Sequence, residues 1–217
     1  DEKNILLTFT KVVRTKEQIV QVYLLDTESS QNAPLDVTSR YEEILKDWQD
    51  LAKIKETAKF STLPESIIDT LSTKSGNLKM SPDDAKLLYL ATSSATLAPV
   101  ISPPLIGSNA TLETRSIQSG NYYVYDKKED KNYFIASQKS LGQPTSITWY
   151  TDSKHIVMVE NVTIYIMDYD GTNKRGVYSG PFLNNLVYPW PGGNRLVILT
   201  NLNHLEGSPN LYQIDLR

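Results

Sequence analysis

Hydrophobic and polar residues alternate along several short stretches of this chain, as they do in strands that bury one face. The clearest stretch reads VTIYIMDYDGTN from Val162. Its alternation ends at Asp168, and a turn follows at Asp170-Gly171. β-Branched and aromatic side chains predominate, which favours a strand over a helix. The pattern therefore predicts a half-buried strand that ends on a carboxylate.

The ending of this strand recurs along the chain. A tyrosine, any residue, an apolar residue and an aspartate follow one another four times. The four copies carry the pairs Tyr23 and Asp26, Tyr123 and Asp126, Tyr165 and Asp168, and Tyr212 and Asp215. A polar turn leading into an apolar run precedes each copy, and these turns begin at Asp1, Asp83, Asp152 and Gly192. Self-similarity of this kind indicates a repeat architecture.

The repeat unit contains four predicted strands, which we call A, B, C and D in chain order. Strand C carries the tyrosine and the aspartate, and tight turns join A to B and C to D. The turns at Asp152 and Gly192 lie 40 residues apart (192 − 152). A four-stranded unit that repeats every ~40–45 residues is typical of a β-propeller blade. The sequence therefore predicts an all-β propeller of about four blades, with units near residues 1–38, 76–136, 145–179 and 185–217.

The recurring tyrosine and aspartate favour a structural role. At the end of strand C the aspartate can accept backbone N–H groups of the turn that follows. The tyrosine offers a large apolar face for packing between blades, while its hydroxyl can reach water. A calcium site at Asp168-x-Asp170 is the alternative, but only this copy has a second carboxylate before a glycine. Because calcium takes about six or more oxygen ligands, we expect no metal site here. We also expect no cofactor.

Two motifs resemble the repeat of TolB-type β-propellers, which reads S-P-D-G, an apolar strand and then I-Y-x-M-D-x-D-G. The first is Ser81-Pro82-Asp83 before the strand from Lys86, and the second is IYIMDYDGTN from Ile164. Asp84 stands where the repeat has glycine, and the likeness covers the four units but not the segments between them. The resemblance implies a propeller and leaves the function open, since such repeats serve many proteins. Related repeats occur in dipeptidyl-peptidase propellers and in surface-anchored proteins of uncultivated bacteria, which implies a periplasmic or cell-surface location.

Two segments interrupt the repeat. In residues 39–75, apolar side chains from Tyr41 to Ile54 follow helical spacing after a possible N-cap at Ser39, and Pro64 can start a second short helix. Residues 93–120 carry Pro99, Pro103, Pro104 and Gly107, which predicts a loop with room for one extra hairpin. In an up-and-down blade the B–C and D–A connections leave from one face of the propeller. We therefore expect both insertions on the same face.

Long loops on a rigid scaffold are frequent binding sites, so we expect residues 41–71 and 96–117 to carry a partner site. The candidate binding residues on or near it are Tyr41, Trp48, Tyr188, Trp190 and His204. The alternative is that the helix only packs over an exposed propeller face. Aromatic residues near strand A could also stack on a sugar, although burial between blades is commoner.

The two ends of the chain do not complement each other. The first unit lacks strand A, and the fourth stops after strand C at Arg217. We therefore expect an incomplete propeller or a piece of a larger one. Open sheet edges can pair with another chain, so self-association through these edges is expected.

Composition narrows the classes of function. The chain has 217 residues, a net charge of −3 and no cysteine. It has no basic cluster for nucleic acid and no thiolate chemistry. No apolar run is long enough to span a membrane. The patterns of a serine-hydrolase elbow, a zinc-protease helix and a phosphate-binding loop are absent. His155 shares its turn position with Asn4, Lys86 and Arg195, which favours a solvated turn residue.

Two hypotheses on function remain. The first is a non-catalytic propeller scaffold or binding module that contacts a protein or a glycan through the face with the insertions. The second is the propeller portion of a larger enzyme, a peptidase or a glycan-acting protein, whose catalytic groups lie outside this chain. The sequence does not name the ligand.

Overall fold

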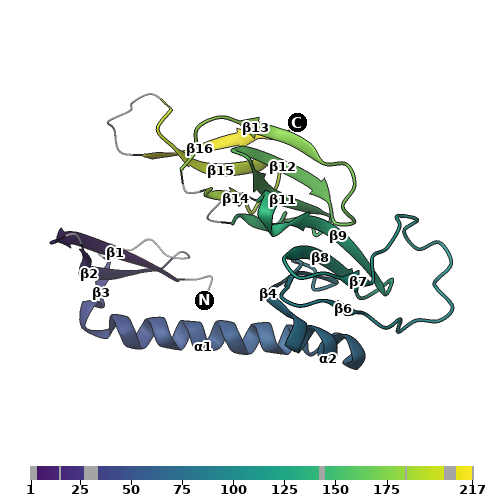
Figure 1. Cartoon of the computed structure of the whole chain (residues 1–217). Coiled ribbons are helices and arrows are strands. Elements are labelled where there is room, and N and C mark those ends of the chain that lie inside the picture. The colour runs from purple at the N-terminus through teal and green to yellow at the C-terminus, as the bar shows by residue number, and fades with distance from the viewer. Residues whose placement is uncertain are drawn as a thin grey trace. The chain divides into compact units, whose positions relative to one another are not determined.

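The fold is taken from a computed structural model that describes residues 4–14, 16–26, 34–141, 145–183, 185–202 and 209–216. The chain divides into two compact units, Asp1–Ala58 and Lys59–Arg217. We call them unit 1 and unit 2 and describe each by itself (Figure 1).

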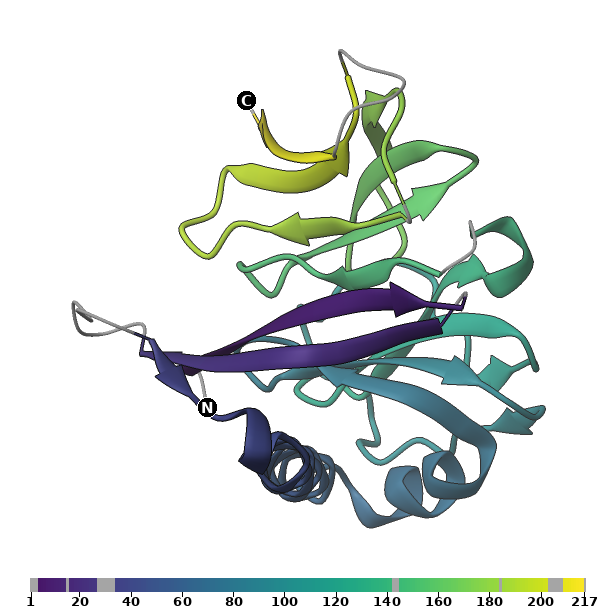
Figure 2. The same ribbon diagram turned by 90° about the vertical axis from the view of Figure 1, so that its left-hand side faces the viewer.

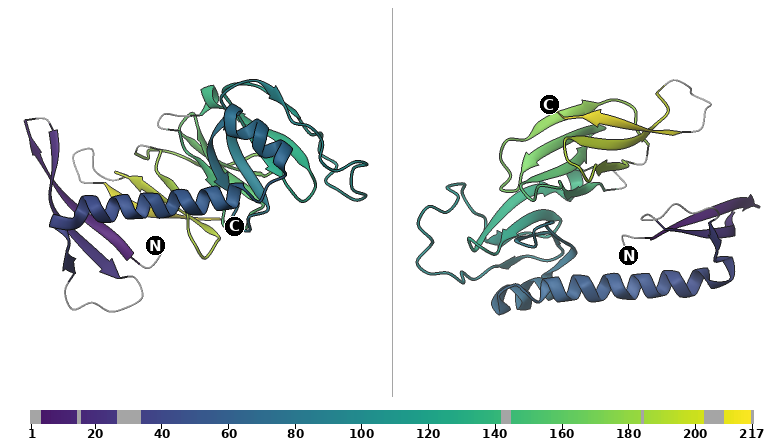
Figure 3. Two further views of the ribbon diagram at one scale, coloured as in Figure 1. Left: turned by 90° about the horizontal axis from the view of Figure 1, so that it is seen from below. Right: turned by 180° about the vertical axis from the view of Figure 1, so that it is seen from behind.

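Unit 1 contains a three-stranded antiparallel sheet and most of a long helix. The strands are β1 (Asn4–Val13), β2 (Lys16–Asp26) and β3 (Leu35–Asp36), in the order β1-β2-β3. A 3₁₀ turn, η1 (Thr38–Arg40), leads into α1 (Tyr41–Phe60), the long straight helix seen in Figure 3. None of the α1 residues is buried. The side chain of Asp36, not that of Ser39, accepts the backbone N–H of Thr38 where the chain turns into η1.

Unit 2 contains three successive antiparallel sheets of the blade type (Figure 2). The first consists of β4 (Ser75–Met80), β5 (Lys86–Ala91), β8 (Asn121–Asp126) and β9 (Lys131–Ser137). The second consists of β10 (Ile147–Trp149), β11 (His155–Glu160), β12 (Thr163–Asp168) and β13 (Arg175–Ser179). The third consists of β14 (Val187–Pro189), β15 (Arg195–Thr200) and β16 (Asn210–Asp215). The short elements α2 (Glu65–Lys74), β6 (Ala95–Thr96), β7 (Ser116–Ile117) and η2 (Gln138–Ser140) complete the unit.

The four sheets share one register. The first residue of strand B pairs with the aspartate of strand C in every sheet: Asn4 with Asp26, Lys86 with Asp126, His155 with Asp168, and Arg195 with Asp215. A common register fixes which side chains share a face, because successive residues of a strand point to opposite faces. The chain is therefore an all-β, incomplete propeller of four small sheets of the blade type, with a two-stranded sheet of β6 and β7 in the B–C connection and a helical insertion.

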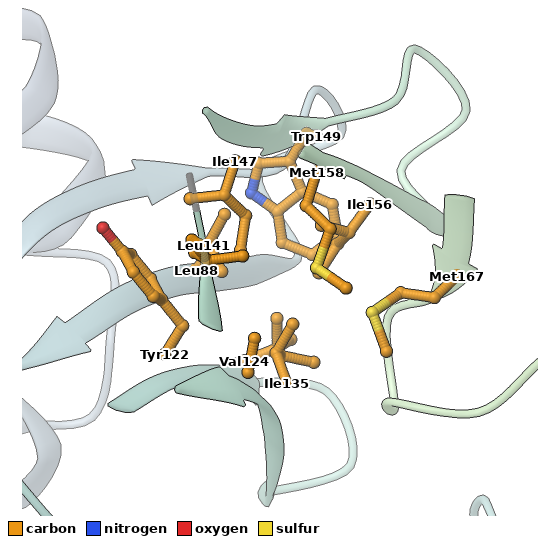
Figure 4. Close-up of a cluster of buried hydrophobic side chains, with 11 residues drawn as sticks. Leu88, Tyr122, Val124, Ile135, Leu141, Ile147, Trp149, Ile156, Met158 and Met167 are labelled. Atoms are coloured by element: carbon orange, nitrogen blue, oxygen red, sulfur yellow. The ribbon is translucent and has the colours of Figure 1, made fainter. Parts of the chain in front are cut away.

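Each sheet of unit 2 has two apolar faces. We call the face of a sheet that is directed toward the preceding element of the chain the leading face, and the face directed toward the next sheet the trailing face. The trailing face of the first sheet packs on the leading face of the second, where Trp149 and Met158 meet Tyr122 and Val124 (Figure 4). The trailing face of the second sheet packs on the leading face of the third in the same way. The indole N–H of Trp149 also donates to the carbonyl of Lys79, at 2.8 Å, across the first of these interfaces.

Helix α2 covers the leading face of the first sheet. Its residues Ile67 and Leu71 are fully buried against Tyr89 and Tyr123. Pro64 takes the N-cap position and Glu65 the first turn, where a carboxylate complements the helix dipole. The apolar stripe of α2 is therefore used in packing, and this part of residues 41–71 is not available to a partner.

The long B–C connection does not stay on the face from which it leaves. After β6, residues 97–115 run along the outer edge of β9, where Thr114 and Asn132 exchange two hydrogen bonds. The backbone N–H groups of Val100 and Ile101 then donate to Asp130, in the turn at the far end of β9. The expectation that both insertions share one propeller face is therefore wrong for this loop, because the carboxylate of Asp130 holds it at the opposite end of the sheet.

Candidate binding face

The A–B and C–D turns of unit 2 form one end of its sheets, which we call the turn face. Local carboxylates hold the turns of the first two sheets. Asp126 accepts the N–H groups of Lys128 and Glu129, and Asp152 accepts that of Lys154, at 2.8 to 3.2 Å. Such contacts fix short polar turns. The aspartates of the repeat therefore order the loops of this face.

A basic side chain stands opposite the repeat aspartate in each sheet of unit 2. The distances between its nitrogen and the carboxylate oxygen are 3.9 Å for Lys86 and Asp126, 3.2 Å for His155 and Asp168, and 3.1 Å for Arg195 and Asp215. These pairs follow directly from the shared register, since the partners lie opposite each other on neighbouring strands. They account for the repeated aspartate in unit 2, whereas the residue opposite Asp26 in unit 1 is Asn4.

His155 lies between two carboxylates. Its Nδ1 is 2.6 Å from Asp152 Oδ2, and its Nε2 is 3.2 Å from Asp168 Oδ1. Burial alone would raise the pKa of Asp152, but the N–H of Lys154 and the imidazole of His155 outweigh it and lower that pKa. Both ring nitrogens are therefore engaged, which leaves His155 to position the turn face.

Two cavities open on the turn face, and both are lined by His155 and Asp168. The first has a volume of about 600 Å³ and lies between the second and third sheets. Its other lining residues are Ile166, Asn173, Arg175, Val177, Asp215 and Leu216. The second, of about 500 Å³, lies between the first and second sheets and is lined mainly by charged residues. Together they form a polar surface with an apolar patch beside Arg175.

The carboxylates of these cavities already have partners. Asp170 accepts hydrogen bonds from Asn109, Thr111 and Thr172. Burial tends to raise the pKa of Asp170, but these donors outweigh it and lower the pKa. The calcium alternative at Asp168-x-Asp170 is therefore unsupported by the geometry, because both carboxylates are held by protein donors. Within the described residues, no three acidic or histidine side chains gather closely enough to hold a metal ion.

The cations of the cavities include three without a partner. In the part of the chain that the structure describes, Arg175, Lys128 and Lys154 line the cavities and form no ion pair. The carboxylates of Glu129 and Asp170 also form no ion pair there, but neutral donors hold them by hydrogen bonds, so the side chains still open to a partner are the three cations. Asn109 belongs to residues 97–115, so the loop reaches the second cavity as well.

The five candidate residues from the sequence do not gather at one place. Tyr41 and Trp48 are half-buried on α1 in unit 1. Tyr188, 62% exposed, lies on the trailing face of the third sheet, and Trp190, 51% exposed, lies in the A–B turn of the turn face. His204 lies outside the described residues. Trp190 is thus the candidate that shares an end of the sheets with the cavities.

The repeat tyrosines of unit 2 lie on leading faces. Tyr123 is fully buried under α2, Tyr165 packs against the first interface between sheets, and Tyr212 packs against the second. The hydroxyl of Tyr123 accepts the N–H of Gln118 at 2.9 Å. In unit 1, Tyr23 pairs edge-to-face with Phe9, with ring centroids 6.0 Å apart.

The sequence reasoning missed Arg175 and Asn109 as residues of the cavities. Arg175 opens strand D, a position for which the repeat gave no pattern. Asn109 lies in a loop whose course depends on Asp130, far from it in the sequence. His155, by contrast, carried a signal, because the residue that opens strand B is a basic residue in every sheet of unit 2.

Comparisons with known proteins give structural similarity only. No protein-family model matches the chain, and no curated protein matches it. Among solved structures, the β-propeller domain of the Trilobed protease from Pyrococcus furiosus is 10% identical, with a TM-score of 0.39, and covers 98% of this chain. A putative TolB from Agrobacterium tumefaciens is 12% identical (TM-score 0.37, 96% of this chain). TolB from Acinetobacter baumannii is 15% identical (TM-score 0.36, 98% of this chain).

The chain spans 51%, 60% and 44% of those three structures, about half their length. Two of the three are TolB proteins, the type of propeller whose repeat the sequence resembles. Because every TM-score lies below 0.5, the fold rests on the sheets, register and interfaces described above. No helix in the described ranges combines the length and apolar composition needed to span a bilayer.

Proposed function

We propose that this chain is a non-catalytic propeller module that binds an acidic, partly apolar segment of a partner protein through the turn face of unit 2. The observation that supports it is the pair of adjoining cavities in which all the carboxylates are engaged and three cations are not. A partner carboxylate near Arg175 would gain a charge-assisted hydrogen bond. Apolar partner side chains would fit beside Ile166 and Val177 in the first cavity.

The proposal places binding on the turn face because α2 is used in packing and the 97–115 loop is anchored elsewhere. A non-catalytic role is supported by His155, whose two nitrogens face carboxylates. As the resemblance implies, we also propose a location outside the cytoplasm, which cell fractionation with an antibody to the chain would test.

The test is a selection of random peptides displayed on phage against the immobilised chain. We expect the enriched peptides to be rich in aspartate and glutamate, and to bind less tightly as salt rises. Arg175→Ala should weaken the selected peptides roughly tenfold or more, as expected for loss of a charged anchor. Lys46→Ala, which removes an exposed cation of α1, is the matched control. Peptides that bind Arg175→Glu as tightly as the unchanged chain would refute the proposal.

A glycan partner is the second candidate, and the exposed ring of Trp190 favours it. Indole rings stack on the apolar faces of sugars. Trp190 lies in the A–B turn of the third sheet, one of the two sheets that border the first cavity. Binding on a glycan array that disappears in Trp190→Ala but persists in Arg175→Ala would select this function over the first.

A further inference from the structure

The shared register defines the two halves of every interface between sheets. In the second sheet the leading positions hold Ile156, Met158, Tyr165 and Met167, and these contact the trailing positions of the first sheet. In the third sheet the leading positions hold Leu196, Ile198, Tyr212 and Ile214, packed on the second. In the first sheet, where no sheet precedes it within unit 2, α2 takes the same place. Every leading face of unit 2 is therefore covered.

The sheet of unit 1 carries the same leading positions, and no described residue buries them as α2 and the sheets do in unit 2. By register they are Ile5, Leu7, Tyr23 and Leu25, with Phe9 one step further along β1. Ile5 is 52% exposed, Leu7 42% and Phe9 48%. These are the side-chain types that are buried at the equivalent positions of unit 2. The leading face of β1-β2-β3 is thus half of an interface.

The third sheet of unit 2 presents the opposite half. Its trailing positions hold Val197, Leu199 and Leu211, with Gln213 at the fourth, and Leu211 is 73% exposed. Tyr188 extends this face through its pairing with Val197. The equivalent positions of the first sheet are Leu88, Leu90, Tyr122 and Val124, all packed against the second sheet. Among the described residues, the leading face of β1-β2-β3 and the trailing face of β14-β15-β16 therefore both keep exposed apolar side chains.

We propose that the leading face of β1-β2-β3 in one copy of this chain docks on the trailing face of β14-β15-β16 in a second copy. The interface would repeat the contacts that unit 2 already makes twice, with the same positions of the repeat on each side. The interface is heterologous, because two different surfaces meet. If each of two copies docks its leading face on the trailing face of the other, a closed dimer results. If each copy docks on a different neighbour, a longer chain of copies results.

The connection between β3 and β4 favours exchange between copies. In unit 2, neighbouring sheets are joined by residues 138–146 and 180–186, whereas residues 37–74 join β3 to β4. Most of that connection is α1, whose 20 residues extend over about 30 Å. Elements carried on such connections are exchanged between protomers at low energetic cost, as in domain swapping.

The experiment uses the whole chain in analytical ultracentrifugation over a wide concentration range. The unchanged chain should associate as its concentration rises. Leu7→Glu and Leu211→Glu should each weaken association roughly 30-fold or more, the loss typical of an interface hot spot. Ile106→Glu replaces a fully exposed apolar residue of the 97–115 loop and should leave association unchanged. Far-UV circular dichroism checks that each variant is folded.

A mixture of the two variants is the decisive sample. Leu211→Glu keeps an intact leading face and Leu7→Glu an intact trailing face, so together they should form a one-to-one complex although each alone is monomeric. A symmetric interface between identical faces would instead leave one variant associating by itself. That result would overturn the proposal, and so would a mixture that fails to pair. An unchanged chain that stays monomeric would also overturn it. If hydrogen exchange of such a monomer showed protected amides in β1, the two faces would be docked within one copy instead.

Discussion

Replacing Asp130 by asparagine tests how the 97–115 loop is held. The Asp130 carboxylate is buried in the turn between β8 and β9. It accepts the N–H groups of Val100 and Ile101 at 2.6 and 2.9 Å and the hydroxyl of Tyr125 at 2.8 Å. The oxygen that accepts the two backbone N–H groups also lies 3.2 Å from the guanidinium of Arg115. An amide of the same shape loses the charge and turns one acceptor into a donor.

The expected cost follows from these contacts. Breaking a buried ion pair by removing one partner costs about 3–5 kcal/mol, because the other charge stays behind. The side chain of Arg115 is 17% exposed and also contacts Glu113, so water and that carboxylate offset part of the loss. We therefore expect Asp130→Asn to lower the free energy of unfolding of unit 2 by about 3 kcal/mol. For a unit of this size that corresponds to a fall in Tm of roughly 6–12 °C.

The measurement is urea unfolding followed by the fluorescence of Trp149, which is buried between the first two sheets. The matched control is Asp69→Asn on the exposed side of α2, which should change the free energy by less than about 0.5 kcal/mol. A loss below about 1 kcal/mol in Asp130→Asn, comparable to an ordinary surface change, would show that Asp130 does not anchor the loop.

Three further predictions concern the same unit. Ile67→Ala should destabilise it by about 2–5 kcal/mol, because Ile67 is fully buried under α2, whereas Ile54→Ala on exposed α1 should be nearly neutral in urea unfolding. Gly171→Ala should cost roughly 2 kcal/mol or more, since a Cβ there would lie 2.5 Å from the carbonyl oxygen of Phe134; Gly120→Ala, with equally positive φ but open space, isolates the backbone part in the same thermal melts. Burial tends to raise the pKa of Asp130, but its hydrogen bonds outweigh burial and lower the pKa below the ordinary 3.8. The stabilisation that the carboxylate provides is therefore present at neutral pH and is lost as pH falls through the lowered pKa. When the free energy of unfolding is measured against decreasing pH, it should fall less in Asp130→Asn than in the unchanged chain.

Much of the fold could be predicted from local pattern. The alternation around Tyr165 fixed strand C, and the recurrence of tyrosine and aspartate gave the repeat, because both depend on residues near one another in the sequence. The helix from Tyr41 also followed from spacing, although its stripe fails to predict burial: Leu51 and Ile54 remain exposed. Periodicity states which face of an element is apolar, but not what will cover it.

The candidate binding face could not be predicted in this way. Its position depends on the course of residues 97–115, and that course is decided by hydrogen bonds from Val100 and Ile101 to an aspartate about 30 residues later in the chain. The amino-acid composition of a loop does not predict which distant residue the loop will contact. The cavities depend likewise on Arg175, whose neighbours come from another strand and another sheet. The positions of the residues that line the cavities therefore depend on long-range polar contacts more than on the pattern of the strands.

The same repeat that made the fold predictable also explains where apolar surface remains. A blade-type sheet is apolar on both faces, so a row of such sheets always requires something at each end. Helix α2 meets that requirement at the start of unit 2, through Ile67 and Leu71. No described residue covers Ile5 and Leu7 in unit 1 or Leu211 in unit 2 to that degree, and burying such side chains gains about 25 cal/mol per Å². Because the exposed halves match by register, the association that we propose between copies requires no recognition element beyond the repeat itself.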